Sequence, residues 1–210
     1  PKKPRPFTQI FRTPYRKRLL QLSLVWALTY MCTQNAVMFW KEFALDERGW
    51  TDGEVGMSIS IAAVLAMPLV FLSGKLLDVI GRRRGALFIF VITSIATVAA
   101  YSLEGRWMLT AALVGAIFGV SGVLPVLNAY SAELFPTELR ADAFGWANNL
   151  LGRIGYVLGP VLVGAVAGSV GWGKAVAMTA IFPILAVAVI MACFPETRGQ
   201  DLDETSALET

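Results

Sequence analysis

Residues 133–160 read ELFPTELRADAFGWANNLLGRIGYVLGP, in which a charged segment is followed by a strongly apolar run. One arginine, Arg153, lies inside the apolar run. If this run crosses a lipid bilayer, the charge costs about 2.5–3.5 kcal/mol on insertion scales, and such charges face a polar interior rather than lipid. Arg153 is therefore a functional candidate from its position alone.

The composition of the whole chain is that of a membrane protein. Its 210 residues are 56% hydrophobic and only 16% charged, which is more apolar than ordinary soluble domains. Histidine is absent, and Cys32 and Cys193 lack the paired spacing of a metal or redox motif, so we expect no metal and no cofactor. The net charge of +3 does not indicate nucleic-acid binding, because the basic residues lie beside apolar runs.

Six apolar runs are long enough to cross a bilayer of about 30 Å as helices. They cover residues 19–40, 55–77, 85–103, 107–132, 143–170 and 174–194. We therefore expect an all-α membrane protein with three parts: a basic loop over residues 1–18, a six-helix transmembrane bundle over residues 19–194 and a polar, acidic tail over residues 195–210. Residues 51–54, TDGE, fit a capping box that opens the second helix, and Pro68 predicts a kink within it.

The positive charges orient these runs in the lipid bilayer. Of the 18 Lys and Arg residues, 14 lie on the membrane side that holds both termini, and four lie on the other side. This count assigns Arg153 to the nearer end of its apolar run. The positive-inside rule therefore places both termini in the cytoplasm, in a plasma or inner membrane.

A line of side chains in the fifth run suits the binding of an organic anion. Steps of three or four residues place Trp146, Asn149, Arg153, Tyr156 and Pro160 on one helical face. A guanidinium flanked by amide and aromatic groups can bind a carboxylate through two hydrogen bonds while an aromatic body stacks nearby. The alternative for Arg153 is a structural ion pair with an acid outside this chain, and the alternative for the aromatic residues is packing.

Other runs carry polar residues that are expected to face a cavity or another helix. These are Tyr30, Gln34 and Asn35 in the first run and Asn128 in the fourth. They are further candidates for substrate binding, although amide side chains also hold helices together. Glycines on other faces of two runs favour close helix packing. They are Gly115, Gly119 and Gly122 in the fourth run and Gly152, Gly155 and Gly159 in the fifth.

Three charged segments fall on the same predicted side of the membrane. Residues 74–83 read GKLLDVIGRR, residues 133–140 read ELFPTELR and residues 195–199 read PETRG. An isolated exposed ion pair contributes only about 0–1 kcal/mol, so charges that close a gate must act as a network. The residues predicted to form this cytoplasmic gate are Asp78, Arg82, Arg83, Glu133, Arg140, Glu196 and Arg198. The alternative is that the arginines only set topology and bind lipid phosphate.

These segments resemble the signature motifs of the major facilitator superfamily. The first is similar to G-x-x-x-D-(R/K)-x-G-R-(R/K), with Val79 in place of a basic residue, and the others to E-x-x-P-x-x-x-R and P-E-T-(K/R)-G of sugar-porter-like members. The resemblance covers residues 19–199 and implies helices seven to twelve of a twelve-helix transporter. It also implies that an N-terminal six-helix half is missing from this chain.

Within that family, parts of residues 136–160 resemble the aromatic acid and metabolite proton symporters. The similarity lies in residues 136–141, PTELRA, in residues 152–155, GRIG, and in Gly159–Pro160, and organic ion transporters come close behind. Sugar porters carry a Gln-Gln pair and a Pro-Trp pair where this chain has Gln34–Asn35 and Pro125–Val126.

The resemblance implies a secondary transporter that moves a small organic anion together with protons by alternating access. No acid lies deep within any run, so the proton-carrying carboxylate is expected in the missing half. The alternatives are a sugar or organic-cation facilitator and a non-transporting six-helix membrane partner or sensor. An enzyme is not expected, because the sequence contains no nucleophile–base pair or metal-ligand set.

Overall fold

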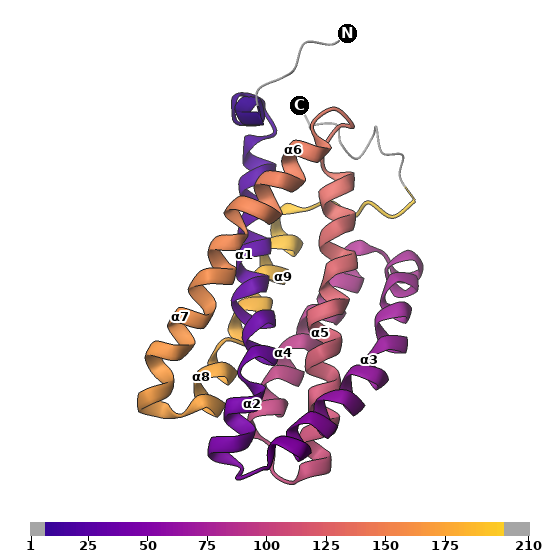
Figure 1. The fold of residues 1–210 in the computed structure, drawn as a ribbon. Helices are drawn as coiled ribbons and strands as arrows, with labels where there is room; N and C mark the ends of the chain where they lie inside the picture. Colours follow the sequence, from indigo (N-terminus) through magenta and orange to yellow (C-terminus); the bar gives the residue numbers. More distant parts are fainter. Residues whose placement is uncertain (1–6, 200–210) are drawn as a thin grey trace.

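The structure, a computed structural model, describes residues 7–199, and these residues form a bundle of helices without strands (Figure 1). The 3₁₀-helix η1 (Phe7–Arg12) comes first. Two short elements, η2 (Phe43–Glu47) and η3 (Gly145–Leu151), are π-helical. The elements after η1, in chain order, are α1 (Arg16–Met38), α2 (Trp40–Glu42), η2, α3 (Asp52–Ile80), α4 (Arg82–Ser102), α5 (Arg106–Glu133), α6 (Arg140–Phe144), η3, α7 (Arg153–Val170), α8 (Trp172–Met178) and α9 (Ile181–Cys193).

Each apolar run of the sequence forms helical structure at the expected place. Five helical segments are long and apolar enough to cross a membrane, at Asp52–Ile80, Arg82–Ser102, Arg106–Glu133, Arg140–Val170 and Trp172–Cys193. The predicted first span, α1, is also long, with 23 residues, but its second half is rich in polar side chains. Thr29, Thr33 and Asn35 are buried there, so α1 runs through the protein interior.

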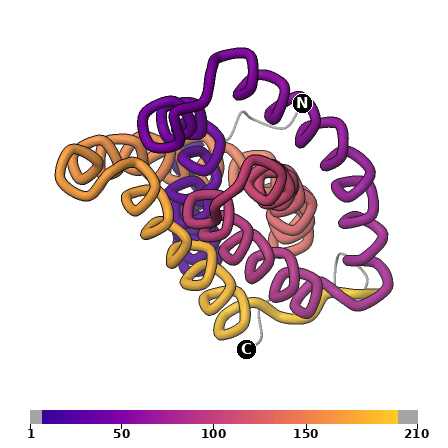
Figure 2. The backbone as a smooth tube through the Cα atoms, turned by 90° about the horizontal axis from the view of Figure 1, so that it is seen from below, coloured from indigo at the N-terminus to yellow at the C-terminus, as the bar shows by residue number. Residues whose placement is uncertain are grey.

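The predicted capping box at the start of α3 is confirmed. Thr51 accepts the backbone N–H of Glu54 at 3.3 Å, and Glu54 Oε2 accepts the backbone N–H of Thr51 at 2.9 Å. This reciprocal pair satisfies two N–H groups that the first turn of a helix otherwise leaves unbonded. From this cap α3 follows a curved path along one edge of the bundle (Figure 2).

The helices differ in how much the bundle covers them. α1 packs against α5, α7 and α9, and α5 packs against α3 and α4. α3 and α7 lie at opposite edges (Figure 2), where only 22% and 28% of their most apolar windows are buried, compared with 50% for α4 and α5. The two edge helices therefore present wide apolar faces outside the bundle.

The glycines of α7 bring its backbone directly against α1, as the sequence predicted. A Cβ atom built on Gly155 would lie 2.0 Å from the carbonyl oxygen of Ala27, and one built on Gly159 would lie 2.9 Å from Asn35 Nδ2. On the preceding turn, a Cβ on Gly152 would lie 2.8 Å from Trp26 Cβ. This close contact fixes the start of α7, and Arg153 with it, beside the middle of α1.

The two ends of the bundle differ in charge. The arginine-rich end contains the α3–α4 turn, the α5–α6 connection and residues 194–199, and it is uppermost in Figure 1. The opposite end contains the α1–α3 connection, the α4–α5 turn and the α7–α8 turn.

Candidate functional site

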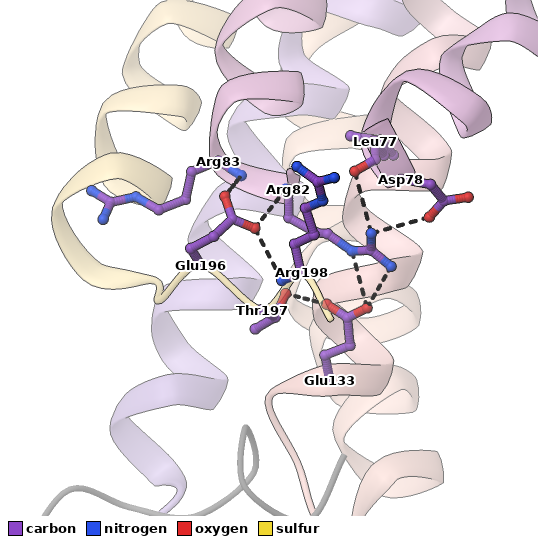
Figure 3. A network of polar contacts seen from close by, with 8 residues as sticks. All are labelled: Leu77, Asp78, Arg82, Arg83, Glu133, Glu196, Thr197 and Arg198. Carbon is purple, nitrogen blue, oxygen red and sulfur yellow. Dashed lines mark hydrogen bonds and ion pairs between the residues drawn. The ribbon is translucent and has the colours of Figure 1, made fainter. Parts of the chain in front are cut away.

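Arg82, the first residue of α4, connects three helices at the arginine-rich end (Figure 3). One terminal nitrogen of its guanidinium lies 3.0 Å from Asp78 Oδ1 on α3 and also donates to the carbonyl oxygen of Leu77 at 3.2 Å. Its Nε and its other terminal nitrogen lie 3.2 Å from Glu133 Oε1 at the end of α5. The structure therefore brings together three of the residues predicted to form a gate.

Glu196 binds the start of α4 from the segment that follows α9. Its carboxylate accepts the backbone N–H of Arg82 at 2.7 Å and that of Arg83 at 3.0 Å, which suits the positive end of a helix dipole. Burial, the largest single cause, raises the pKa of Glu196, but four backbone N–H groups, those of Arg82, Arg83, Thr197 and Arg198, together outweigh it and hold the pKa below its ordinary value of 4.5. Glu196 is therefore a carboxylate that caps α4.

Gly81 makes room for that cap. Its φ of +95° is a conformation that residues with a side chain rarely adopt. A Cβ atom at this position would also lie 2.7 Å from Glu196 Oε2. The second glycine of the GKLLDVIGRR segment is therefore required both by the backbone turn and by the approach of Glu196.

The remaining predicted gate residues are placed differently. Arg83 donates from its side chain to the carbonyl of Met191. Within residues 7–199, Arg198 gives Glu196 only its backbone N–H, at 3.1 Å, and Arg140 donates only to the carbonyl of Phe135, at 3.5 Å. Arg140 is not paired with Glu133, because Arg82 occupies one carboxylate oxygen and the hydroxyl of Thr197 donates to the other. Thr197 is a member of this network that sequence reasoning missed.

The second cluster surrounds Arg153. The carbon at the centre of its guanidinium lies 5.0 Å from the centre of the Tyr156 ring and 5.6 Å from the centre of the Tyr30 ring. The two rings meet edge to face, with centroids 5.7 Å apart. Among residues 7–199, no carboxylate forms an ion pair with Arg153. The arrangement is a cation held over two aromatic rings with its hydrogen-bond donors available.

The asparagine that joins this cluster is Asn148, not the predicted Asn149. Tyr30 donates its hydroxyl hydrogen to Asn148 Oδ1 at 2.6 Å, whereas Asn149 is exposed. The difference arises in η3, where i→i+5 bonding changes the register relative to the 3.6-residue period used for the prediction.

Trp146 also lies away from the Arg153 cluster. Its ring stacks on Phe7 with centroids 4.8 Å apart, meets Phe11 edge to face, and donates its Nε1–H to the carbonyl of Phe7 at 2.8 Å. These contacts hold η1 against the bundle, so the ring that was predicted to line a substrate site has a packing position here.

The three other predicted polar residues lie in separate places. Asn35 is fully buried beside Gly159, with its Nδ2 donating to the carbonyl of Met31 at 2.6 Å, which is an interhelical packing position. Gln34 is partly exposed on α1. Asn128 lies on α5, at a cavity shared with Arg140 near the arginine-rich end.

The opposite end contains a second cap that the sequence did not reveal. Glu47 Oε1 accepts the backbone N–H of Gly173 at 3.0 Å, close to the start of α8. The preceding Gly171 has a φ of +87°, and a Cβ atom on it would lie 2.7 Å from Glu47 Oε1. The two partners are 126 residues apart, so only the fold brings them together.

Comparison with known proteins gives one family and several relatives. The model of the family described as the Major Facilitator Superfamily matches residues 22–209. The chain is 30% identical to a candidate metabolite transport protein of Haemophilus influenzae over 80% of the chain and 41% of that protein. It is 29% identical to a candidate 4-methylmuconolactone transporter of Cupriavidus pinatubonensis, over 91% of the chain and 45% of that protein.

A third relative is a candidate niacin/nicotinamide transporter of Bacillus subtilis, which is 25% identical over 87% of the chain and 44% of that protein. The chain thus spans less than half the length of each of these three relatives.

Proposed function

The chain belongs to the Major Facilitator Superfamily, and on that premise we propose that it is the C-terminal half of a secondary transporter for a small organic anion. The family and the apolar helices make it a multi-pass membrane protein whose function is transport rather than chemical conversion. The substrate that we propose is an aromatic acid or a related metabolite, carried together with protons by alternating access.

The observation that carries this proposal is the position of Arg153. Its guanidinium lies against Tyr30 and Tyr156 and has no carboxylate partner among residues 7–199. A guanidinium in this state can form two parallel hydrogen bonds with a carboxylate, while the two rings offer surface to an aromatic body. The names of two relatives, for 4-methylmuconolactone and for niacin/nicotinamide, support a small organic substrate.

The exposed faces of α3 and α7 support a second half that completes the transporter. Both helices leave most of their apolar surface outside the bundle, and Arg153 is exposed at the start of α7. We propose that an N-terminal six-helix half covers this side, holds the proton-carrying carboxylate and closes the substrate site. Lipid covers the remaining apolar surface.

The network around Arg82 supports the mechanical part of the proposal. We propose that it lies at the cytoplasmic face, in agreement with the excess of positive charge there, and that it stabilises the state closed at this end. Opening would separate the partners of Arg82 on α3 and α5. The same excess of positive charge supports our proposal that both termini lie in the cytoplasm.

The test is benzoate uptake by the native polypeptide that contains this chain, reconstituted in proteoliposomes. Arg153→Ala should weaken the apparent affinity for benzoate about 10- to 100-fold, since hydrogen bonds to a charged group contribute about 1.5–3 kcal/mol. Arg153→Lys should recover part of the loss, because it restores the charge without the planar fork. Arg84→Ala removes an exposed arginine outside both clusters and is the matched control.

Three further measurements separate the alternatives. An inward proton gradient should accelerate benzoate uptake if protons are carried along. If glucose or tetraethylammonium inhibited benzoate uptake more strongly than aromatic acids do, the substrate would instead be a sugar or an organic cation. Unchanged benzoate affinity in both Arg153 variants would show that Arg153 does not bind the substrate.

A further inference from the structure

We propose that the cavity between α5 and α6 is a second anion-binding station, in which Arg140 binds the carboxylate of the transported acid and Phe144 contacts its organic body. This inference rests on the proposed function, because it takes the same substrate class. It assigns Arg140 to substrate binding rather than to the charge network of the gate.

The cavity has the volume of a small-molecule site and is open on one side. Its volume is about 580 Å³, within the range of about 300–1,000 Å³ that is usual for ligand pockets. The side chains of Asn128, Thr137 and Arg140 supply hydrogen-bond donors, and Phe144 supplies an aromatic surface. Among the described residues that line it, Arg140 is charged and none is acidic.

Arg140 has unused hydrogen-bonding capacity in this cavity. Its one hydrogen bond among the described residues goes to the carbonyl of Phe135, at a long distance of 3.5 Å. Its Nε is buried and has no partner among the described residues, so a ligand cannot reach it directly. A bound carboxylate would instead meet the terminal nitrogens, of which Nη1 has no hydrogen bond to residues 7–199. Arg82, at the same end, contrasts with it, because its guanidinium is bound to two carboxylates and a carbonyl.

Aromatic packing connects this cavity with the Arg153 cluster. Starting at Tyr30, which lies under Arg153, the next ring is that of Trp26, with centroids 5.4 Å apart, and Trp26 meets Phe144 edge to face at 6.2 Å. Trp26 also places its Nε1 3.4 Å from Ser131 Oγ, on the cavity wall. Both arginines therefore belong to one packed unit formed by α1 and the segment from α6 to α7.

The separation of the two arginines allows both to be occupied at once. Arg140 and Arg153 are 13 residues apart, which corresponds to about 20 Å along a helical path. Exposed charges are largely screened beyond a Debye length of about 8 Å at physiological ionic strength. Two bound carboxylates would repel each other only weakly, so the station predicts two anions bound to one polypeptide.

The experiment is equilibrium binding of radiolabelled benzoate to the native polypeptide that contains this chain, in lipid nanodiscs. The unmodified protein should bind two benzoates. Arg140→Gln should remove one and leave the affinity of the other within about twofold, since the sites are screened from each other. Arg140→Lys should retain both but weaken one about tenfold, because the ammonium lacks the planar fork. Arg84→Gln is the matched control and should bind two.

The benzoate retained by Arg140→Gln also reports that this variant is folded. If Arg140→Gln still bound two benzoates with unchanged affinities, the second station would be wrong. It would also be wrong if the unmodified protein bound one benzoate and only Arg153→Ala removed it. If Arg153→Ala retained both benzoates while Arg140→Gln lost one, the station would stand and the role proposed for Arg153 would fail. If the unmodified protein bound no benzoate, the proposed function would fail, and the station with it.

Discussion

At the arginine-rich end Glu196 accepts two backbone N–H groups from the start of α4, and at the opposite end Glu47 accepts one near the start of α8. Each of these helices follows a glycine with positive φ, +95° at Gly81 and +87° at Gly171. Both ends thus have a glycine turn whose following helix is capped by a glutamate distant in sequence. Its presence at both ends indicates that this arrangement stabilises the fold and is not specific to one function.

The surroundings of the two caps differ. At the arginine-rich end, Arg82 joins the cap to Asp78 and Glu133, and the side chains of Arg82 and Glu133 are only 19% and 12% exposed. At the opposite end, Lys41 and Asp52 form an ion pair with side chains 57% and 77% exposed, and Arg106 and Glu54 form another with side chains 34% and 39% exposed. The arginine-rich end therefore has a shielded network that connects several elements, whereas the opposite end has separate and more exposed ion pairs.

Breaking the network at Arg82 should have the largest effect on stability. Loss of one partner from a buried ion pair costs about 3–5 kcal/mol, and because this pair is partly exposed we expect Arg82→Gln to lower the free energy of unfolding by about 2–3 kcal/mol. Denaturant unfolding in detergent, followed by tryptophan fluorescence, measures the change.

Lys41→Gln is the matched control for Arg82→Gln, because it also removes one cation from an ion pair and leaves a carboxylate behind. We expect no measurable change in its unfolding, since exposed pairs contribute little. Equal destabilisation by the two substitutions would contradict this difference between the two ends of the bundle.

The helices and the Arg82 network could be predicted because their signals are local or lie in known motifs. Apolar runs set the helix positions, Thr51 and Glu54 set the start of α3, and the glycine spacing of α7 set its contact with α1. The structure also brings Arg82 to Asp78 and Glu133, as the shared side of the three charged segments indicated.

The details of the substrate site could not be predicted in the same way. A regular helix of 3.6 residues per turn places Asn149 and Trp146 with Arg153, but the π-helical turns of η3 place Asn148 there instead. Nothing in residues 145–151, GWANNLL, distinguishes such turns from an α-helix. The partner of Glu47 was missed for another reason, since Gly173 is brought to it only by tertiary packing.

Substitution of the turn glycines should separate backbone strain from the crowding of the caps. A positive φ costs a residue with a side chain about 1–2 kcal/mol, so Gly105→Ala, at +84° with no atom within 4 Å of the added Cβ, should be destabilising by about that amount. Gly81→Ala and Gly171→Ala should cost more, because each Cβ would lie 2.7 Å from a glutamate oxygen.

The comparison of the three glycine variants uses the same unfolding measurement. Gly81→Ala should be the most destabilising of the three, since Glu196 would lose two N–H bonds and Glu47 only one. If all three variants lost the same stability, crowding of the caps would contribute nothing and backbone strain would account for the whole effect.

The smallest expected effect is a dependence of the α4 cap on pH. The folded-state pKa of Glu196 lies below the ordinary carboxyl value of 4.5, so its contribution to stability is present above that value and is lost as the pH falls through the folded-state pKa. The difference in unfolding midpoint between the unmodified protein and Glu196→Gln should therefore be constant at neutral pH and shrink between about pH 5 and about pH 3.

Glu196→Gln suits this test because the amide cannot titrate but keeps one oxygen that accepts an N–H group. A midpoint difference that stayed constant down to about pH 3 would show that the charge of Glu196 adds nothing to the cap. A shrinking difference would show that the α4 cap depends on an ionised carboxylate. Acid would then loosen the contact between α4 and the segment after α9, and with it one side of the network that holds Arg82.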